Sequence, residues 1–176
     1  AAVAALRAAH PSSADALRLS GDLALRAKRH AEAERFYVEA HARAPSQALL
    51  ARIATLAVSR GAPQAAMPQL ERWLSERGED ATVREMLAEL HMKAGGMTAA
   101  AEQYERIIGA GEASARVYNN LANIRLALGK GDALQAAEKA YALAPEDARV
   151  LDTLGWVLAQ AGRLDEALRH LRDARL

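Results

Sequence analysis

The chain has 176 residues, about the length of one ordinary domain and enough to bury a sizeable hydrophobic core. It contains 23 Lys and Arg against 22 Asp and Glu, and the net charge of +1 gives no field for steering nucleic acid or an anionic membrane surface. Cysteine is absent, which excludes disulfides, thiolate catalysis and every cysteine-ligated metal site.

The first segment, residues 1–10, carries a short apolar helical pattern that includes Arg7, and we expect it to be the end of a preceding repeat helix. It lacks the charged start and long apolar stretch of a secretory signal. The chain begins without Met, so we interpret it as a piece of a longer protein. No direct membrane insertion is expected, because Arg52 interrupts the most apolar stretch, 48–58.

Small residues then recur at a nearly constant spacing. One series of glycines has separations of 34, 34 and 33 residues: Gly61, Gly95, Gly129 and Gly162. A second series shares the period: Gly21, Ala54, Ala88, Ala122 and Gly155. A period near 34 residues indicates a stacked solenoid. Alanine supplies 44 of the 176 residues, which favours helices that pack closely through small side chains.

Each repeat predicts two helices. In the last one, apolar residues follow one helical face over 150–158 and Gly162 ends the pattern. A second face then begins with Ala167, Leu168 and Leu171. Because glycine readily adopts the left-handed conformation found just past a helix, we place the first glycine series at turns. Pro45 and Pro145 should stop second helices. The second small-residue series lies mid-helix, where a glycine such as Gly21 predicts a close approach of two helices.

These patterns predict an all-α chain of about five helix-turn-helix units. Their expected ranges are 14–46, 47–80, 81–114, 115–147 and 148–176. The unit at 47–80 should be irregular, because Pro68 falls inside its second helix and proline fits only in the first turn.

The units resemble tetratricopeptide repeats over nearly the whole chain. The large residue near the start of the family's first helix falls on Leu17, Leu50, Tyr118 and Leu151, with Arg84 departing from the pattern. The following large-to-small step falls on Ile53-Ala54, Leu87-Ala88, Leu121-Ala122 and Leu154-Gly155. The resemblance implies a right-handed α-solenoid that binds a protein or peptide partner in a concave groove, lined by the first helix of each unit.

Two strings narrow the resemblance. They are Tyr118-Asn119-Asn120-Leu121-Ala122-Asn123 and Leu151-Asp152-Thr153-Leu154-Gly155-Trp156. Both are similar to the carboxy-terminal repeats of the tetratricopeptide lipoprotein of bacterial PEP-CTERM/exosortase systems, and related strings occur in scaffolds of polysaccharide export. This implies a cell-envelope protein of exopolysaccharide export or protein sorting, in the periplasm or as an outer-membrane lipoprotein. A cytoplasmic location stays open.

The family's groove positions supply the candidate partner contacts: Asn119, Asn120, Asn123, Asp152, Trp156, Arg52 and Glu89. The three asparagines are the only ones in the chain, and their amides can both donate to and accept from a peptide backbone. Trp156 could anchor a partner as a rigid amphipathic ring. The alternatives are that the amides bond to neighbouring helices and that the indole packs on the preceding helix.

The charged candidates come from the middle of the chain. Arg52 is the best carboxylate contact, because its own helix carries no acid at the four-residue spacing. Glu89 would form part of a polar groove wall, although the ladder Glu85, Glu89 and Lys93 is also typical of a solvated helix face.

Catalytic and metal-binding patterns are missing from the sequence. Gly129-Lys130-Gly131-Asp132 lacks the rest of a phosphate loop, and the five histidines show no paired spacing of three or four. We therefore expect no enzyme activity, cofactor or metal, and predict a protein-protein interaction scaffold that binds a peptide or partner helix. The alternative is a structural spacer or self-assembling scaffold with an empty groove.

Overall fold

A computed structural model describes residues 13–174, so the helix end expected at residues 1–10 lies outside the described part. Within residues 13–174 the secondary structure is ten α-helices and one 3-10 helix, with no strand. The all-α prediction is confirmed. None of the helices in this range combines the length and the apolar character needed to cross a bilayer.

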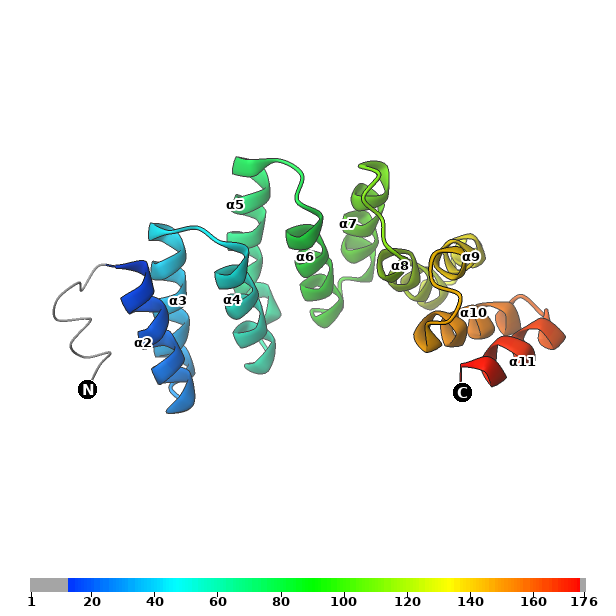
Figure 1. Cartoon of the computed structure of the whole chain (residues 1–176), viewed down its shortest axis with the longest axis horizontal. Helices are drawn as coiled ribbons and strands as arrows, with labels where there is room; N and C mark the ends of the chain where they lie inside the picture. Colours follow the sequence, from blue (N-terminus) through cyan, green and yellow to red (C-terminus); the bar gives the residue numbers. More distant parts are fainter. Residues whose placement is uncertain (1–12, 175–176) are drawn as a thin grey trace. The chain divides into compact units, whose positions relative to one another are not determined.

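The described chain divides between Ala94 and Gly95 into two compact units. The first contains α2 (Ala14–Arg26), α3 (His30–Arg43), α4 (Gln47–Ser59), the 3-10 helix η1 (Pro63–Ala66), α5 (Met67–Arg77) and α6 (Ala81–Lys93). Helix α2 packs on α3, α3 on α4, α4 on α6 and α5 on α6 (Figure 1). Tyr37, Leu50 and Leu70 are among its fully buried core side chains.

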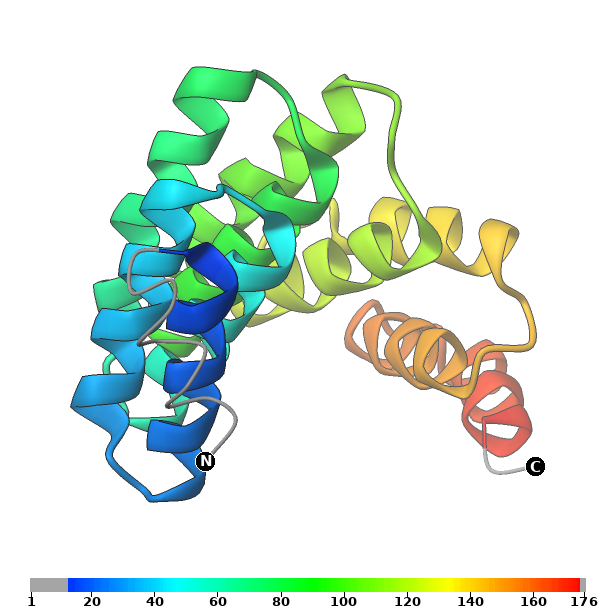
Figure 2. The same ribbon diagram turned by 60° about the vertical axis from the view of Figure 1, so that its left-hand side comes forward.

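The second unit contains α7 (Met97–Gly109), α8 (Ala115–Ala127), α9 (Ala133–Leu143), α10 (Ala148–Gln160) and α11 (Leu164–Asp173). Helix α8 packs on α7, α9 and α10, and α10 also contacts α9 and α11 (Figure 2). Tyr104, Leu121 and Ile124 are buried in its core. Each turn between packed neighbours is short, so consecutive helices run antiparallel.

The periodic glycines form one recurring turn. After α4, the Gly61 N–H donates to the Val58 carbonyl at 3.0 Å, and the next N–H donates to Ala57 at 2.9 Å. This pair of bonds satisfies two carbonyls at the helix end in the Schellman arrangement. The same bonds follow α8 at Gly129 and α10 at Gly162, and all three glycines have φ between +67° and +77°. The predicted turn positions are confirmed.

The end of α2 uses this turn without a glycine. Lys28 has φ +58°, its N–H donates to Leu25 at 2.9 Å, and the Arg29 N–H donates to Ala24 at 2.8 Å. A residue with a side chain is disfavoured in this left-handed conformation by about 1–2 kcal/mol. The first repeat therefore carries a local strain that the later turns avoid.

The mid-helix glycines lie where two helices touch. A Cβ on Gly21 would lie 2.5 Å from Tyr37 Cε1 on α3, and one on Gly155 would lie 2.5 Å from Leu171 Cγ on α11. Ala88 and Ala122, at the equivalent positions of α6 and α8, are fully buried. The predicted close approach is confirmed at both glycines.

The first helix of each pair also starts with a side-chain cap. The capping residues accept a backbone N–H from the first turn and recur with separations of 33, 34, 34 and 33 residues: Ser13, Ser46, Asp80, Ser114 and Asp147. The second helices begin without one, and α5 instead has Pro68 in its first turn, after η1. Capping by Ser or Asp stabilises a helix by about 1 kcal/mol, so this series fixes where each first helix begins.

Candidate functional site

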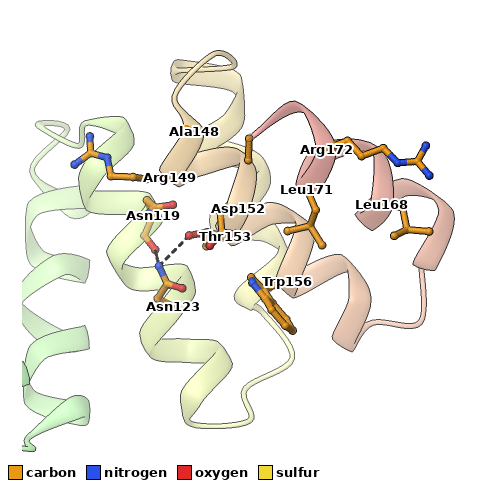
Figure 3. A pocket seen from close by; sticks show the side chains of 11 residues that line it. Asn119, Asn123, Ala148, Arg149, Asp152, Thr153, Trp156, Leu168, Leu171 and Arg172 are labelled. Atoms are coloured by element: carbon orange, nitrogen blue, oxygen red, sulfur yellow. Dashed lines mark hydrogen bonds between the residues drawn. The ribbon is translucent and has the colours of Figure 1, made fainter. Parts of the chain in front are cut away.

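Helices α8, α10 and α11 surround an open pocket of about 830 Å³ in the second unit. Asn119 and Asn123 line it from α8, Asp152 and Trp156 from α10, and Leu168 from α11 (Figure 3). Four of the seven residues selected from the sequence therefore meet in one place. Leu168 was not selected, because the sequence pattern assigned it only to a helix packing face.

Asp152 and Trp156 of α10 face the pocket because the other face of this helix is buried in the core. Gly155 lies against Leu171, and Leu151 and Leu154 are buried, so this face is committed to the core. Residues four apart on a helix lie one above the other, which places Asp152 and Trp156 on the same open side. Trp156 is 54% exposed, although its indole is one of the largest apolar groups in the chain.

The amide of Asn123 is held in place by two hydrogen bonds. Its Nδ2 donates to the Asn119 backbone oxygen at 3.1 Å and to Thr153 Oγ1 at 3.0 Å. An amide nitrogen has two hydrogens, so both donors are used and only Oδ1 remains for a partner. The Oδ1 of Asn119 is buried and accepts no hydrogen bond within residues 13–174.

Asp152 is the one acid among the described residues that line the pocket. Arg149 and Arg172 also line it, but Figure 3 shows both side chains extending away from Asp152. Arg149 Nη2 lies 2.8 Å from Asp147 Oδ2, and this side-chain hydrogen bond lowers the pKa of Asp147 to about 2. Among the described residues, the Asp152 carboxylate has no hydrogen bond or ion pair.

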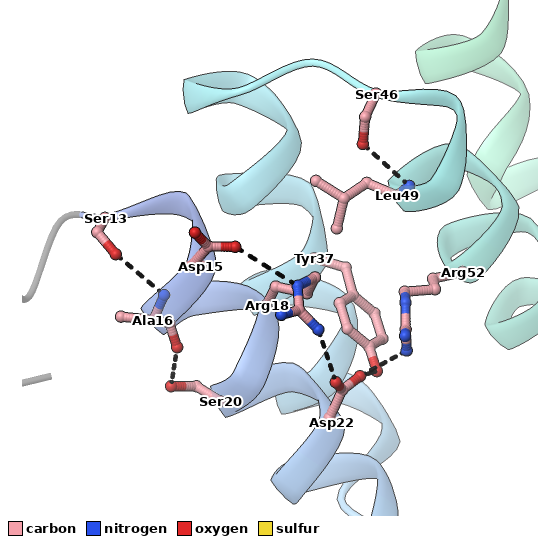
Figure 4. Close-up of polar contacts among 10 residues, drawn as sticks. All are labelled: Ser13, Asp15, Ala16, Arg18, Ser20, Asp22, Tyr37, Ser46, Leu49 and Arg52. Atoms are coloured by element: carbon pink, nitrogen blue, oxygen red, sulfur yellow. Dashed lines mark hydrogen bonds and ion pairs between the residues drawn. The ribbon is translucent and has the colours of Figure 1, made fainter. Parts of the chain in front are cut away.

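Arg52 lies in the first unit, where its charge is already matched. Its Nη1 is 2.5 Å from Asp22 Oδ1, and Asp22 also accepts from the Tyr37 hydroxyl at 2.7 Å and from Arg18 at 3.3 Å (Figure 4). Burial and the Asp22 carboxylate raise the pKa of Tyr37. The carboxylate that we expected from a partner is thus supplied by the neighbouring helix of the same chain, which corrects the reasoning from Arg52's own helix.

Asn120 and Glu89 do not line the pocket. Asn120 Nδ2 donates to the Tyr104 hydroxyl at 3.0 Å and so ties α8 to α7, as the alternative reading of the asparagines predicted. Glu89 is an exposed residue of α6 in the first unit. The candidate site reduces to Asn119, Asn123 and the two α10 residues.

The contacts of Arg52 and Asn123 obey one spacing rule. Asp22 and Arg52 are 30 residues apart, and so are Asn123 and Thr153. In both cases a residue late in one first helix meets a residue near the middle of the next first helix. Polar residues 30 apart in the sequence are therefore the signal that could have identified these hydrogen bonds between first helices of neighbouring repeats.

Sequence models of the tetratricopeptide repeat match residues 1–48, 51–115, 85–133 and 113–175. The chain belongs to the tetratricopeptide repeat family. Tetratricopeptide repeats generally form protein-protein interaction scaffolds, and this is the function class of the chain.

Solved structures share the fold. A crystal structure of MamA protein is 21% identical, with a TM-score of 0.74 over 92% of this chain and 89% of that one. The structure of MamA 41-end from Desulfovibrio magneticus RS-1 is 20% identical, with a TM-score of 0.73 over 92% and 93%. At such identities the likeness shows the tetratricopeptide repeat fold alone. No curated protein sequence matches the chain.

Proposed function

We propose that the chain is a noncatalytic scaffold whose second unit binds a peptide or a partner helix in the pocket between α8, α10 and α11. One observation carries this proposal: four residues selected for groove chemistry line a single pocket, around an indole that is 54% exposed. Tryptophan is enriched among residues that dominate binding energy, because a rigid ring loses little entropy when it is covered.

The pocket has the size and chemistry for a few residues of a partner. Its volume of about 830 Å³ falls within the range of ligand sites. Asn123 Oδ1 would accept a backbone N–H from an extended segment, while Trp156 and Leu168 would cover apolar side chains. An amphipathic helix could use the same apolar side chains.

The finer role that we propose is in bacterial cell-envelope export or protein sorting, including exopolysaccharide systems. It rests on the similarity of 118–123 and 151–156 to repeats of the PEP-CTERM/exosortase lipoprotein. Finding a lipid-attachment cysteine ahead of these repeats in the complete protein would support it.

Photo-crosslinking tests the binding site. A photoreactive phenylalanine replaces Trp156 in one variant and Leu128 in the control. Leu128 is the 38%-exposed residue that follows the end of α8, and it does not line the pocket. We expect a discrete crosslinked partner in native cells only from position 156, and its loss when excess unlabelled wild-type chain is added. Equal crosslinking from both positions, or none from 156, would contradict the proposal.

A self-assembling scaffold is the second candidate, and the surface of α11 favours it. Leu164 and Leu168 are 61% and 51% exposed. If they join copies of the chain, changing both to Gln should abolish any concentration-dependent rise in mass measured by light scattering. Leu143→Gln on α9, where the leucine is 56% exposed, is the matched control and should leave the mass unchanged.

A further inference from the structure

The pocket contains one carboxylate that has no partner. Asp152 is exposed, and no described residue donates a hydrogen bond to it or forms an ion pair with it. By contrast, Asp22 in the first unit accepts from three side chains, and Asp80 accepts from Gln47 and Trp73. An unpaired acid beside apolar side chains is available to a cation brought by a ligand.

The surroundings of Asp152 favour a cation of a particular shape. Trp156 lies one helical turn further along α10, so the two Cβ atoms are about 5–6 Å apart. A Lys or Arg side chain can place its alkyl stem across the indole while its charged end meets the carboxylate. Figure 3 shows the guanidinium groups of Arg149 and Arg172 directed away from this point, so neither fills it.

Two further features bound the same place. Asn123 presents only an acceptor, because both of its N–H groups are used by Asn119 and Thr153. On the opposite side, Leu168 is 51% exposed and lines the pocket from α11. A ligand that satisfies the whole surface therefore needs hydrogen-bond donors next to an apolar side chain.

We infer that the pocket selects peptide segments in which a Lys or Arg lies within one helical turn of a large apolar residue. The basic side chain pairs with Asp152 over the Trp156 ring, and the apolar side chain contacts Leu168. This inference rests on the proposed function and names the chemistry of the partner. An acidic peptide end is disfavoured beside Asp152, because it would place two like charges together.

Selection from a phage-displayed library of random short peptides tests the inference. The library is panned separately on the wild-type chain and on the Trp156→Ala, Asp152→Lys and Asp165→Lys variants. Asp165 is an exposed acid of α11 outside the pocket, so its variant makes the same charge change as a control. Circular dichroism checks that each variant keeps the wild-type helix content.

The wild type and Asp165→Lys should enrich peptides with Lys or Arg near Leu, Ile or Phe, whereas Asp152→Lys should lose this preference or enrich Asp and Glu. A synthetic peptide from the selection should bind Asp152→Asn about three- to tenfold more weakly, and high salt should reduce the difference. Enrichment that needs Trp156 but shows no basic preference would overturn the inference and leave the proposed function standing. Peptides enriched equally by wild type and Trp156→Ala would contradict both.

Discussion

The turn after the first helix of a repeat depends on a single residue in the left-handed conformation. This residue is a glycine after α4, α8 and α10, but it is Lys28 after α2. Lys28 adopts φ +58° there. We predict that Lys28→Gly raises the free energy of unfolding by about 0.5–1 kcal/mol, because the relief of left-handed strain exceeds the added entropy of the unfolded chain. Urea unfolding followed by circular dichroism measures it. Gly61→Ala should lower stability by a similar amount, and a loss in both variants would contradict the account of the turn.

Close contact at Gly21 reverses the usual effect of replacing glycine in a helix. An alanine there gains up to about 1 kcal/mol of helix propensity but places its methyl 2.5 Å from the Tyr37 ring, so we predict a net loss of about 1–2 kcal/mol. Gly109, at the end of α7, has no atom within 4 Å of its ideal Cβ. Gly109→Ala should be neutral or slightly stabilising in the same urea measurement. Stabilisation by Gly21→Ala would show that α2 and α3 are not in close contact.

At the scale of elements, Asp80 joins three helices. Its carboxylate caps α6 at Val83 and accepts from Gln47 on α4 and from Trp73 on α5, each at 2.8 Å. Burial alone would raise the pKa of Asp80, but these hydrogen bonds outweigh it and hold the pKa below its ordinary value. Trp73 therefore serves the packing of the first unit.

The lowered pKa gives a direction of pH dependence. Because the folded pKa lies below the unfolded one, the charge of Asp80 stabilises the fold above about pH 4, and this contribution is lost as the pH falls through the folded pKa. Asp80→Ala should cost about 1–2 kcal/mol at pH 7. Asp80→Asn, which keeps a capping group, should flatten the loss of stability that occurs as the pH falls below about 4. Urea midpoints across this range measure both. If the stability of Asp80→Asn fell with pH in the same way as that of the wild type, the role given to the Asp80 charge would be contradicted. Asp165→Asn is the control variant.

The elements could be predicted from the sequence because each is marked locally. Gly61 and Gly162 need a left-handed turn, Pro68 fits only a first turn, and Ser46 and Asp147 cap helices, so spacing alone locates the helices. The hydrogen bonds between first helices of neighbouring repeats have no such local mark, because they depend on how the repeats pack. The sequence indicates them only through polar pairs 30 residues apart, such as Asn123 and Thr153.

At the scale of the whole molecule, a repeat array should respond to a local change locally, because each repeat contacts only its neighbours. Gly155→Ala would place a methyl 2.5 Å from Leu171 Cγ and loosen α10 from α11. We predict that hydrogen exchange accelerates most in α10 and α11, less in α8, and not in α2 or α3. A uniform acceleration in all helices would show instead that the chain unfolds as one cooperative body.

Only part of the candidate site could be predicted from the sequence. Asn123 was selected because asparagine is a poor helix former with an amide suited to a peptide backbone, and Trp156 because a rigid indole can anchor a partner. Both line the pocket. Asn120 was selected on the same ground as Asn123, and Arg52 because its own helix carries no acid at the four-residue spacing. Their partners Tyr104 and Asp22 come from other helices, at separations of 16 and 30 residues. A side chain's availability depends on such tertiary neighbours.

The central claim is that the pocket around Trp156 receives the partner, and indole N–H signals in NMR test it most directly. The chain has two tryptophans, so a nitrogen-labelled sample gives two signals, assigned by replacing each residue in turn. On titration with a peptide selected by the wild-type chain, the Trp156 indole signal and the side-chain amide signal of Asn123 should shift together. The indole signal of Trp73, whose N–H donates a hydrogen bond to Asp80, should stay in place. A shift confined to Trp73, or binding that moves neither indole, would contradict the account.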